Sequence, residues 1–283
     1  MDAGASTALG CRLSTPTDSA ADPYRRADKQ NSWDTYGAEY WAGAGDTSHP
    51  SALETENFLS GAGPGQRVLV LGATTTEVIQ AALDCGAEAH VLDFAPRLLG
   101  LVQQRFGDKV ATHHQDLTDP VDDQLLQRFD IVVGDRLVNR FHRNEMPGVL
   151  ANMMSTVAIG GQLRISVRFG LYPLDSRLIE VGREMGTVTN FWDESSWTLN
   201  WSRVGEELDR CARDHGEIPR QVVIAWSRLR GVESRLREDD MPRLVAEAGG
   251  GASPWEIVEV LDMDVAPQSK TFVIARASAR GDV

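Results

Sequence analysis

The stretch Arg67-Val68-Leu69-Val70-Leu71-Gly72-Ala73-Thr74-Thr75-Thr76 decides the fold of this chain. Residues 68–71 form an unbroken apolar run, which is typical of a strand covered on both faces of a sheet. Gly72 allows the backbone to turn sharply and lets a ligand approach the chain closely. Residues from about 77 to 85 then predict a helix whose free N–H groups point at whatever lies over the turn. The stretch therefore predicts a strand, a ligand-binding turn and a helix in direct succession.

A second predicted strand, residues 90–92, ends at Asp93. Asp93 follows Gly72 by roughly 20 residues, which is the spacing at which an acidic side chain can hold a ribose through its hydroxyls. The two segments together predict a nucleoside site over the Gly72 turn.

Predicted helices and strands continue to alternate beyond Asp93. The helices lie near residues 96–106 and 145–157, and the strands are residues 111–114, 129–135 and 162–167. This alternation predicts right-handed crossovers and a parallel sheet. Two further strands, residues 255–260 and 270–275, have a short connection and predict an antiparallel terminal hairpin. The expected fold class is therefore α/β, with a mostly parallel sheet of seven strands.

The start of the chain has a different composition. Residues 1–31 contain few large apolar side chains and are predicted to be a mobile tail, so the folded domain is expected over residues 32–283. Helical spacing puts Trp33, Tyr36 and Tyr40 on one face, which predicts either a packing stripe or a lid over a cofactor pocket. Ser51 and Glu54 then have the pattern of a capping box at the start of a helix.

The segment 169–253 interrupts the alternation and is predicted to be a helical, tryptophan-rich insertion between strands five and six, on the substrate side of the domain. Its residues Trp192, Trp197 and Trp201 are expected to form a minor core, with an apolar acceptor pocket and a dimer contact as alternatives.

Composition and charge limit the partners of this chain. Its 283 residues carry a formal net charge of -13, with 42% hydrophobic and 24% charged residues, which is typical of a globular protein. The acidity argues against nucleic acid and an anionic membrane as partners, and no apolar run is long enough for a membrane span. The dispersed cysteines, Cys11, Cys85 and Cys211, predict no disulfide framework and no metal site. A cytoplasmic protein that acts on a small molecule is expected. Its oligomeric state is left open, with a homodimer as one option.

At this point the chain resembles the class I S-adenosylmethionine-dependent methyltransferases, over residues 33–167 and the closing strand pair. The resemblance rests on residues 68–72, on Asp93-Phe94, on Gln115-Asp116-Leu117, on residues 130–135, and on Gly160-Gly161-Gln162-Leu163 at the turn into strand five. It implies a Rossmann-like fold and S-adenosylmethionine (SAM) as the cofactor.

The resemblance also implies roles for single residues. The backbone at Gly72, Ala73 and Thr74 would approach the amino acid portion of SAM, and Gly134 would end strand four beside it. Asp93 would accept hydrogen bonds from the ribose, and Phe94 would lie against adenine. Asp116 would accept a hydrogen bond from the adenine amino group, and the Leu117 N–H would donate to the adenine ring. The alternatives for Asp93 and Asp116 are a helix cap and a turn aspartate.

The first turn departs from the family pattern. That pattern is Gly-x-Gly-x-Gly, whereas Thr74 and Thr76 stand where the second and third glycines would be. The threonines narrow the turn and place hydroxyl groups near the expected methionine tail. This change argues against a nicotinamide dinucleotide site, because such a site needs glycines for close approach of the backbone to a pyrophosphate. It is compatible with SAM held in an altered tail conformation.

Candidate catalytic residues follow strands four and five. Asn139 can orient an amine or hydroxyl nucleophile, and Asp135 can contact the cofactor amine or take a proton. His142 is a weaker candidate for a base, because a solvated histidine is the more common role. Tyr172, at the carboxyl edge of the sheet, can stabilise a sulfonium through its ring, as can Tyr36 and Tyr40. Packing is the alternative for Tyr172.

Three functions remain open on this evidence. The first is a SAM-dependent transferase that moves a methyl group to oxygen or nitrogen of a small molecule. The second is transfer of the 3-amino-3-carboxypropyl tail, including cyclisation of SAM to azetidine-2-carboxylate with release of methylthioadenosine. The threonine-rich turn, Asn139 and Tyr172 resemble what the azetidine-2-carboxylate synthases would need. The third is a non-catalytic SAM-binding module.

Overall fold

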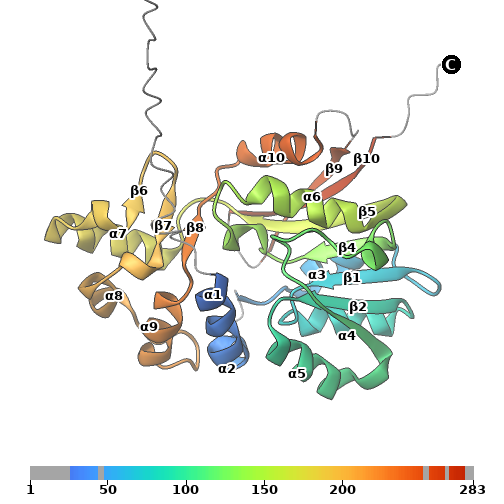
Figure 1. Cartoon of the computed structure of the whole chain (residues 1–283), viewed down its shortest axis with the longest axis horizontal. Coiled ribbons are helices and arrows are strands. Elements are labelled where there is room, and N and C mark those ends of the chain that lie inside the picture. Colours follow the sequence, from blue (N-terminus) through green and yellow to red (C-terminus); the bar gives the residue numbers. More distant parts are fainter. Residues whose placement is uncertain (1–25, 44–47, 251–254, 265–267, 278–283) are drawn as a thin grey trace, which may run out of the picture.

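The computed structural model describes residues 26–43, 48–250, 255–264 and 268–277. Its centre is a seven-stranded sheet with the strand order β3-β2-β1-β4-β5-β10-β9 (Figure 1). The strands are β1 (Arg67–Leu71), β2 (Glu88–Asp93), β3 (Val110–His114), β4 (Phe129–Gly134), β5 (Val157–Arg168), β9 (Trp255–Asp262) and β10 (Ser269–Arg276). The first five are parallel, and β10 runs antiparallel to both β5 and β9. The predicted fold class and its terminal antiparallel pair are therefore confirmed.

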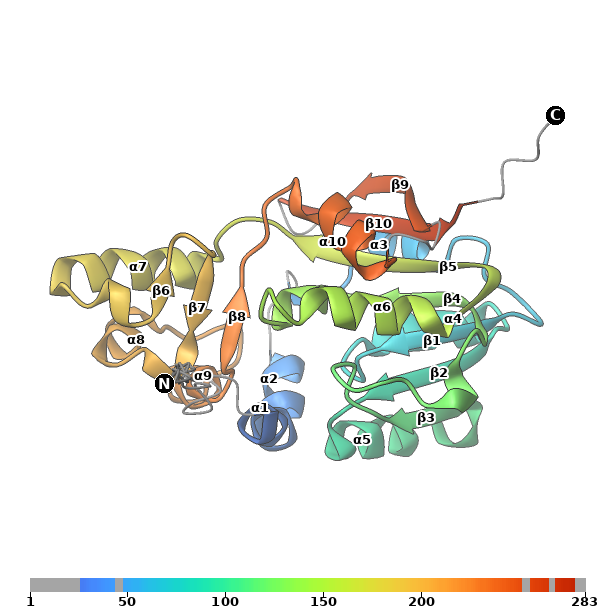
Figure 2. The ribbon, with the colours of Figure 1, turned by 45° about the horizontal axis from the view of Figure 1, so that its top comes forward.

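Helices cover both faces of this sheet (Figures 1 and 2). They are α3 (Ala52–Leu59), α4 (Thr76–Asp84), α5 (Pro96–Phe106), α6 (Met146–Thr156) and α10 (Asp240–Ala248). Strand β1 shows why both faces need a cover, because its side chains alternate between two cores. Val68 and Val70 pack with α3, α4 and α5 on one face, whereas Leu69 and Leu71 pack with α6 and α10 on the other.

The register of the parallel strands brings three chain segments to one edge. Leu71 at the end of β1 pairs with Leu92 of β2 on one side and with Gly134 of β4 on the other. The residues that follow each strand end therefore meet at the same edge of the sheet. This edge is where ligands bind in open α/β sheets.

Strand β5 starts earlier than the sequence predicted. Its pairing with β4 jumps from Phe129–Val157 to Ile131–Gln162, so the predicted glycine turn is a bulge inside the strand. Gly160 has a φ of +82°, and a Cβ on Gly161 would lie 2.7 Å from the Asp130 carbonyl oxygen. Only glycines allow the two strands to approach in this way.

The segment 169–253 contains a small body of its own, with α7 (Pro173–Met185), α8 (Glu206–Cys211) and α9 (Arg220–Arg228). A three-stranded sheet joins them, made of β6 (Trp192–Asp193), β7 (Thr198–Asn200) and β8 (Val232–Ser234). Trp192 and Trp201 are buried in its separate core and Trp197 packs against that core, as the expectation of a minor core predicted. The last helix of the segment, α10, instead packs on α6 of the main domain.

The N-terminal part differs from the prediction. Helix α1 (Arg26–Ser32) falls within the predicted tail, and it continues into a π-helical turn (Trp33–Gly37) and α2 (Ala38–Gly43). Residues 1–25 lie outside the described part of the chain. Figure 2 shows α1 and α2 between the main sheet and the insertion. Lys29 and Ser32 are buried there, because Ser32 donates to the Trp226 carbonyl of α9 and Trp33 packs edge to face on Trp226.

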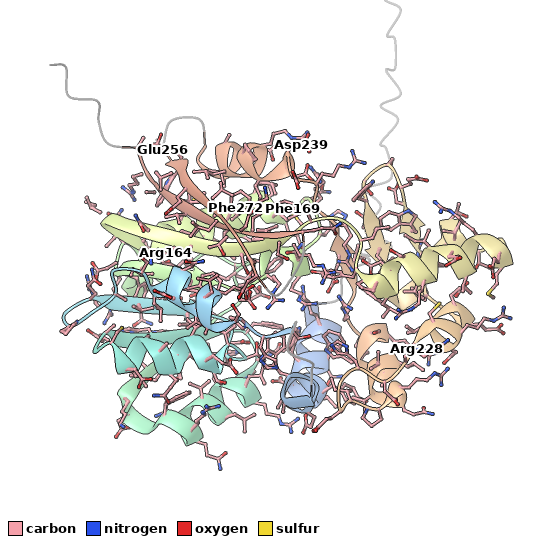
Figure 3. The ribbon with its side chains drawn as sticks, turned by 180° about the vertical axis from the view of Figure 1, so that it is seen from behind. Arg164, Phe169, Arg228, Asp239, Glu256 and Phe272 are labelled. Atoms are coloured by element: carbon pink, nitrogen blue, oxygen red, sulfur yellow. The ribbon has the colours of Figure 1, made fainter. Side chains whose placement is uncertain are left out.

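The end of β5 is held against β10 by aromatic packing. Phe169, just after β5, meets Phe272 of β10 edge to face with ring centroids 6.0 Å apart (Figure 3). This contact fixes the point at which the chain leaves the sheet for the insertion. No helix in the described ranges is long and apolar enough to cross a membrane.

Candidate active site

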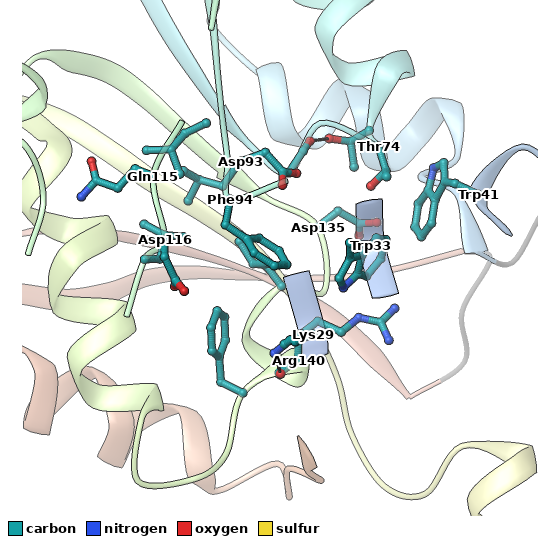
Figure 4. Close-up of a pocket in the computed structure, with 17 residues that line it drawn as sticks. Lys29, Trp33, Trp41, Thr74, Asp93, Phe94, Gln115, Asp116, Asp135 and Arg140 are labelled. Atoms are coloured by element: carbon teal, nitrogen blue, oxygen red, sulfur yellow. Dashed lines mark hydrogen bonds between the residues drawn. The ribbon is translucent and has the colours of Figure 1, made fainter. Parts of the chain in front are cut away.

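A cavity lies over the ends of β1, β2 and β4, and we call it the strand-edge cavity (Figure 4). Gly72, Asp93 and Asp135 follow or end these strands and all line it. The remaining lining residues are Lys29, Trp33, Trp41, Leu71, Thr74, Thr75, Leu92, Phe94, Gln115, Asp116, Leu117, Leu137, Arg140 and Phe141. Residues from five segments far apart in the sequence therefore converge on one site.

The turn after β1 is built as the sequence predicted. Gly72 has a φ of +102°, which favours glycine, and no atom lies within 4 Å of the Cβ that another residue would add. Thr75 donates its hydroxyl to the Gly72 carbonyl at 2.9 Å, so this threonine holds the turn. Thr74 lines the cavity, and within the described chain its hydroxyl has no hydrogen-bond partner. Of the threonine hydroxyls near the expected methionine tail, that of Thr74 is the one available to a ligand.

Asp93 is tied directly to that turn. Its Oδ2 accepts a hydrogen bond from the Ala73 N–H at 2.7 Å, and its Oδ1 accepts one from the Ala95 N–H at 2.8 Å. Burial raises the pKa of Asp93 to about 6, although the Ala73 and Ala95 N–H groups act in the opposite direction. A carboxylate has room for about four hydrogen bonds, so two acceptor positions remain for hydroxyls in the cavity. Asp93 thus caps backbone groups and also lines the site.

Asp116 lies on the other side of the cavity from Thr74, with Phe94 between these two residues (Figure 4). Leu117 also lines the cavity. The Asp116 Oδ1 accepts hydrogen bonds from the N–H and the hydroxyl of Thr118, both at 2.8 Å. This is the turn-aspartate role, and it leaves Oδ2 free of partners among the described residues. Leu117 is fixed through its carbonyl, which accepts from the Asn152 amide.

Asp135 lies where this cavity meets a second one. The second cavity is lined by Trp41, Ser48, Asp135, Arg136, Arg140, Arg168, Tyr172, Pro173, Leu174, Asp175, Arg177, Trp201, Arg213, Asp214, His215, Val223, Trp226 and Arg230. Its carboxylate accepts hydrogen bonds from Ser166 at 2.6 Å and from two nitrogens of Arg136 at 2.9 and 3.0 Å. Its side chain is only 1% exposed. Oδ1 accepts from both Ser166 and Arg136, whereas Oδ2 accepts from Arg136 alone, so Oδ2 has room for one further donor of the kind that a cofactor amine provides. The predicted proton transfer to Asp135 stays a prediction.

Asn139 lies elsewhere than the sequence predicted. It is 1% exposed and lines neither cavity. Its Nδ2 donates to the Arg168 carbonyl at 2.7 Å, and its Oδ1 accepts from the Arg168 N–H at 3.0 Å. These are the two hydrogen bonds that a neighbouring strand would form with Arg168. The Asn139 amide therefore fixes the end of β5. In this structure it positions Arg168 and does not face a transferred group.

The other predicted residues divide into two groups. Tyr172 lines the second cavity, whereas Tyr36 and His142 line neither, and the side chain of Tyr40 lies outside the described part. Ala73 is buried behind the turn, and Gly134 is buried in β4. The π-helical turn explains the aromatic positions, because its wider turn shifts the face that later side chains occupy. Trp33 and Trp41 line the strand-edge cavity, whereas Tyr36, which was predicted to do so, does not.

Lys29 is a site residue that the sequence did not indicate. It is 4% exposed, donates a hydrogen bond to the Arg140 carbonyl, and lies 4.6 Å from the centre of the Phe141 ring. Burial lowers its pKa to about 8. No signal near position 29 indicated this, since its neighbours are polar and its burial comes from contacts with distant segments.

The low pKa of Lys29 predicts how stability depends on pH. An unfolded lysine has a pKa of about 10.4, so between pH 8 and 10 the unfolded chain binds more protons than the folded one. We therefore expect Lys29 to make the free energy of unfolding rise across this window, by up to about 1.4 kcal/mol per pH unit. Urea unfolding of the wild type and of Lys29→Met at pH 7.5, 8.5 and 9.5 measures this, and parallel curves for the two proteins would contradict it.

The seven-stranded sheet, with its antiparallel β10 and its cavity over β1, β2 and β4, has the fold of class I SAM-dependent methyltransferases. Two solved structures show the same fold. CcbJ methyltransferase from Streptomyces caelestis is 13% identical with a TM-score of 0.57, over 88% of this chain and 99% of its own. The Burkholderia thailandensis 1,6-didemethyltoxoflavin-N1-methyltransferase was solved with bound 1,6-didemethyltoxoflavin and S-adenosylhomocysteine (SAH). It is 14% identical with a TM-score of 0.53, over 88% of this chain and 87% of its own.

A third structure is much more similar. It is a Rhodobacter sphaeroides protein described as "Putative Zn-dependent Alcohol Dehydrogenases", 31% identical with a TM-score of 0.84, over 88% of this chain and 98% of its own. This chain belongs to the same family as that protein. No family model and no curated protein matches the sequence.

The residues of this chain do not fit the zinc ion in that description. A catalytic zinc takes three protein ligands from His, Cys, Asp or Glu. Within the described ranges no group of three such side chains is arranged to hold a metal ion. Cys85 and Cys211, the cysteines in those ranges, are both free thiols outside the two cavities.

Proposed function

We propose that this protein is a SAM-dependent transferase that moves a methyl group to an oxygen or nitrogen of a small molecule. The observation that carries the proposal is the joint placement of Gly72, Asp93 and Asp116 around one cavity at the carboxyl edge of the sheet. In this arrangement Asp93 accepts hydrogen bonds from the ribose hydroxyls. The free oxygen of Asp116 accepts one from the adenine amino group, and the Leu117 N–H donates to the ring.

The cavity also suits the positive sulfur of the cofactor. Trp33 and Trp41 present aromatic faces in the part of the cavity nearest Thr74 and Asp135 (Figure 4). Each such face can stabilise a sulfonium by about 0.5–2 kcal/mol. Asp135 accepts a hydrogen bond from the cofactor amine, and Thr74 donates its hydroxyl to the tail. SAM supplies an activated methyl group when it binds.

The chain's own residues then orient the transfer. An acceptor in the second cavity approaches past Asp135 and directs a lone pair at the methyl carbon, in line with the sulfur–methyl bond. Bound SAM would supply the methyl group, since a bond from the acceptor to the methyl carbon would form as the sulfur–carbon bond breaks and sulfur would keep the electron pair. The acceptor's proton would pass to water, and SAH would remain. Orientation of this kind decides which carbon of SAM reacts.

Transfer of the 3-amino-3-carboxypropyl tail is the second candidate. It is favoured by Thr74, whose free hydroxyl occupies a glycine position of the family pattern and would bend the tail away from the usual path. In the intramolecular form the amine of bound SAM would bond to its own tail carbon as the bond between that carbon and sulfur breaks. Methylthioadenosine would leave with the electron pair, the amine would lose a proton to water, and azetidine-2-carboxylate would result. A protein that binds SAM and does not turn it over is the third candidate.

Product analysis separates these functions. We expect the purified protein to leave SAM intact in the absence of an acceptor, and to form SAH when a nucleophilic small molecule is supplied. Methylthioadenosine in the acceptor-free reaction, detected by liquid chromatography with mass spectrometry, would assign the tail chemistry instead. Calorimetry that found no affinity for SAM or SAH in a protein with an intact circular-dichroism spectrum would overturn all three.

A further inference from the structure

A second cavity adjoins the strand-edge cavity, and we call it the arginine-lined cavity. The two share Trp41, Asp135 and Arg140. The second cavity lies between the end of β5, the start of α7 and helix α9, so the insertion forms its outer wall. Its apolar wall includes Trp201, Val223 and Trp226.

Three of the six arginines around this cavity are already paired with a carboxylate. Arg136 pairs with Asp135, and Arg230 pairs with Glu233. Arg140 lies 3.9 Å from the Glu233 carboxylate. The lining carboxylates are likewise engaged, because Asp135 is held by Arg136 and Asp175 by two nitrogens of Arg235. Arg177, Arg213 and Asp214 also line the cavity but are exposed to solvent.

Arg168 is the exception among the half-buried cations. Within the described chain its guanidinium makes no hydrogen bond and has no carboxylate within 4.0 Å. Its Nε is buried without a partner. Burial lowers its pKa, and the neighbouring charge of Arg136 acts in the same direction. A buried donor left without a partner is costly, so this group is where an anionic ligand would gain most.

The structure holds Arg168 firmly in place. The Asn139 amide binds both the N–H and the carbonyl of Arg168. The guanidinium lies 4.5 Å from the centre of the Tyr172 ring, which also lies 4.5 Å from the buried guanidinium of Arg235. The Tyr172 N–H is in turn bound by Asp175 at 2.8 Å. A guanidinium fixed in this way loses little freedom when it binds a planar carboxylate through two parallel hydrogen bonds.

We propose that the arginine-lined cavity binds a carboxylate at Arg168, next to the reacting end of the cofactor. The inference rests on the proposed function and names the group that this site recognises. The carboxylate comes either from the acceptor, whose apolar body packs on Trp201 and Trp226, or from the cofactor's own α-carboxylate bent past Asp135. Asn139 and Tyr172 are positioning residues for this contact.

Binding measurements with Arg168→Met test the proposal and separate its two sources. SAH carries the α-carboxylate, and methylthioadenosine has the same nucleoside without it. For the cofactor source, we expect the affinity for SAH to fall about 10- to 100-fold in the variant while that for methylthioadenosine stays the same. For the acceptor source, both nucleosides bind unchanged. In that case the SAH-loaded wild type binds benzoate more tightly than benzamide, and the SAH-loaded variant binds the two compounds with equal affinity.

Three controls keep the test decisive. Arg203→Ala removes an exposed arginine of the insertion that lines neither cavity, and it should behave as the wild type in every assay. Arg168→Lys keeps the charge without the planar fork and should give an intermediate loss. Unchanged affinity for methylthioadenosine shows that Arg168→Met is folded. A wild type that binds SAH, together with an Arg168→Met variant equal to it for SAH, benzoate and benzamide, would overturn the proposal and leave the proposed function standing.

Discussion

Replacing Asp93 with asparagine is expected to weaken the binding of SAH by about 10- to 100-fold. The carboxylate is 7% exposed and keeps two acceptor positions for the cavity after binding the N–H groups of Ala73 and Ala95. An amide offers one oxygen in place of two, so it cannot cap both backbone groups and also receive two hydroxyls. Calorimetric titration of both proteins with SAH measures the loss, and equal dissociation constants would remove Asp93 from the cofactor site.

The same residue predicts how binding depends on pH. The pKa of Asp93 in the free protein is raised to about 6 by burial. Hydroxyl groups that donate to the carboxylate favour its charged form, so the pKa is lower in the complex, and binding below pH 6 releases a proton. Affinity for SAH should therefore be constant above about pH 7 and fall by up to about tenfold per unit below pH 6.

The Asp93→Asn variant is the control for this pH dependence. Its side chain does not titrate, so its lower affinity should be flat between pH 5 and 8. Melting curves at each pH confirm that both proteins stay folded. A wild type whose affinity is also flat would show that the carboxylate makes no contact with the ligand.

Replacing Glu233 with glutamine is expected to lower the free energy of unfolding by about 3–5 kcal/mol. Glu233 is 1% exposed, and its carboxylate binds Arg230, Arg235 and the indole N–H of Trp201. Burial alone would raise its pKa, yet the guanidinium groups of Arg230, Arg235 and Arg140 hold the pKa well below its usual range. Its stabilising effect is therefore fully present at neutral pH and is lost only as the pH falls below the value for an unfolded glutamate.

The reason for the large effect is the charge left behind. A glutamine has almost the same shape, but it leaves Arg235 buried with one negative partner, Asp175, and Arg230 buried with no carboxylate partner among the described residues. Urea unfolding at pH 7 measures the difference. Glu194→Gln is the matched control, because Glu194 is exposed and lies 4.0 Å from the exposed Arg183, so the change should stay within about 0.5 kcal/mol. Equal losses in the two variants would contradict the role given to the buried network.

Local sequence determined the central sheet. The apolar run of residues 68–71, the Gly72 turn and the capping box of Ser51 and Glu54 each follow from contacts within a few residues, and all are present in the structure. Helix α5 was predicted with its observed bounds, Pro96–Phe106, because its proline at the start and glycine after the end are local signals. The order and spacing of these elements were enough to place Gly72 and Asp93 at one edge.

Tertiary structure alone decided which side chains face the site. Lys29 lies in a polar segment and is buried because α1 docks between the sheet and the insertion. Asn139 was predicted to face the transferred group, but the end of β5 passes close enough to use its whole amide. No sequence signal indicated Arg168. Its guanidinium has no hydrogen-bond or carboxylate partner in the described chain because of where distant carboxylates lie. Hydrogen bonds and charges act over a few ångströms in space, and the sequence specifies that distance only for residues that are near one another along the chain.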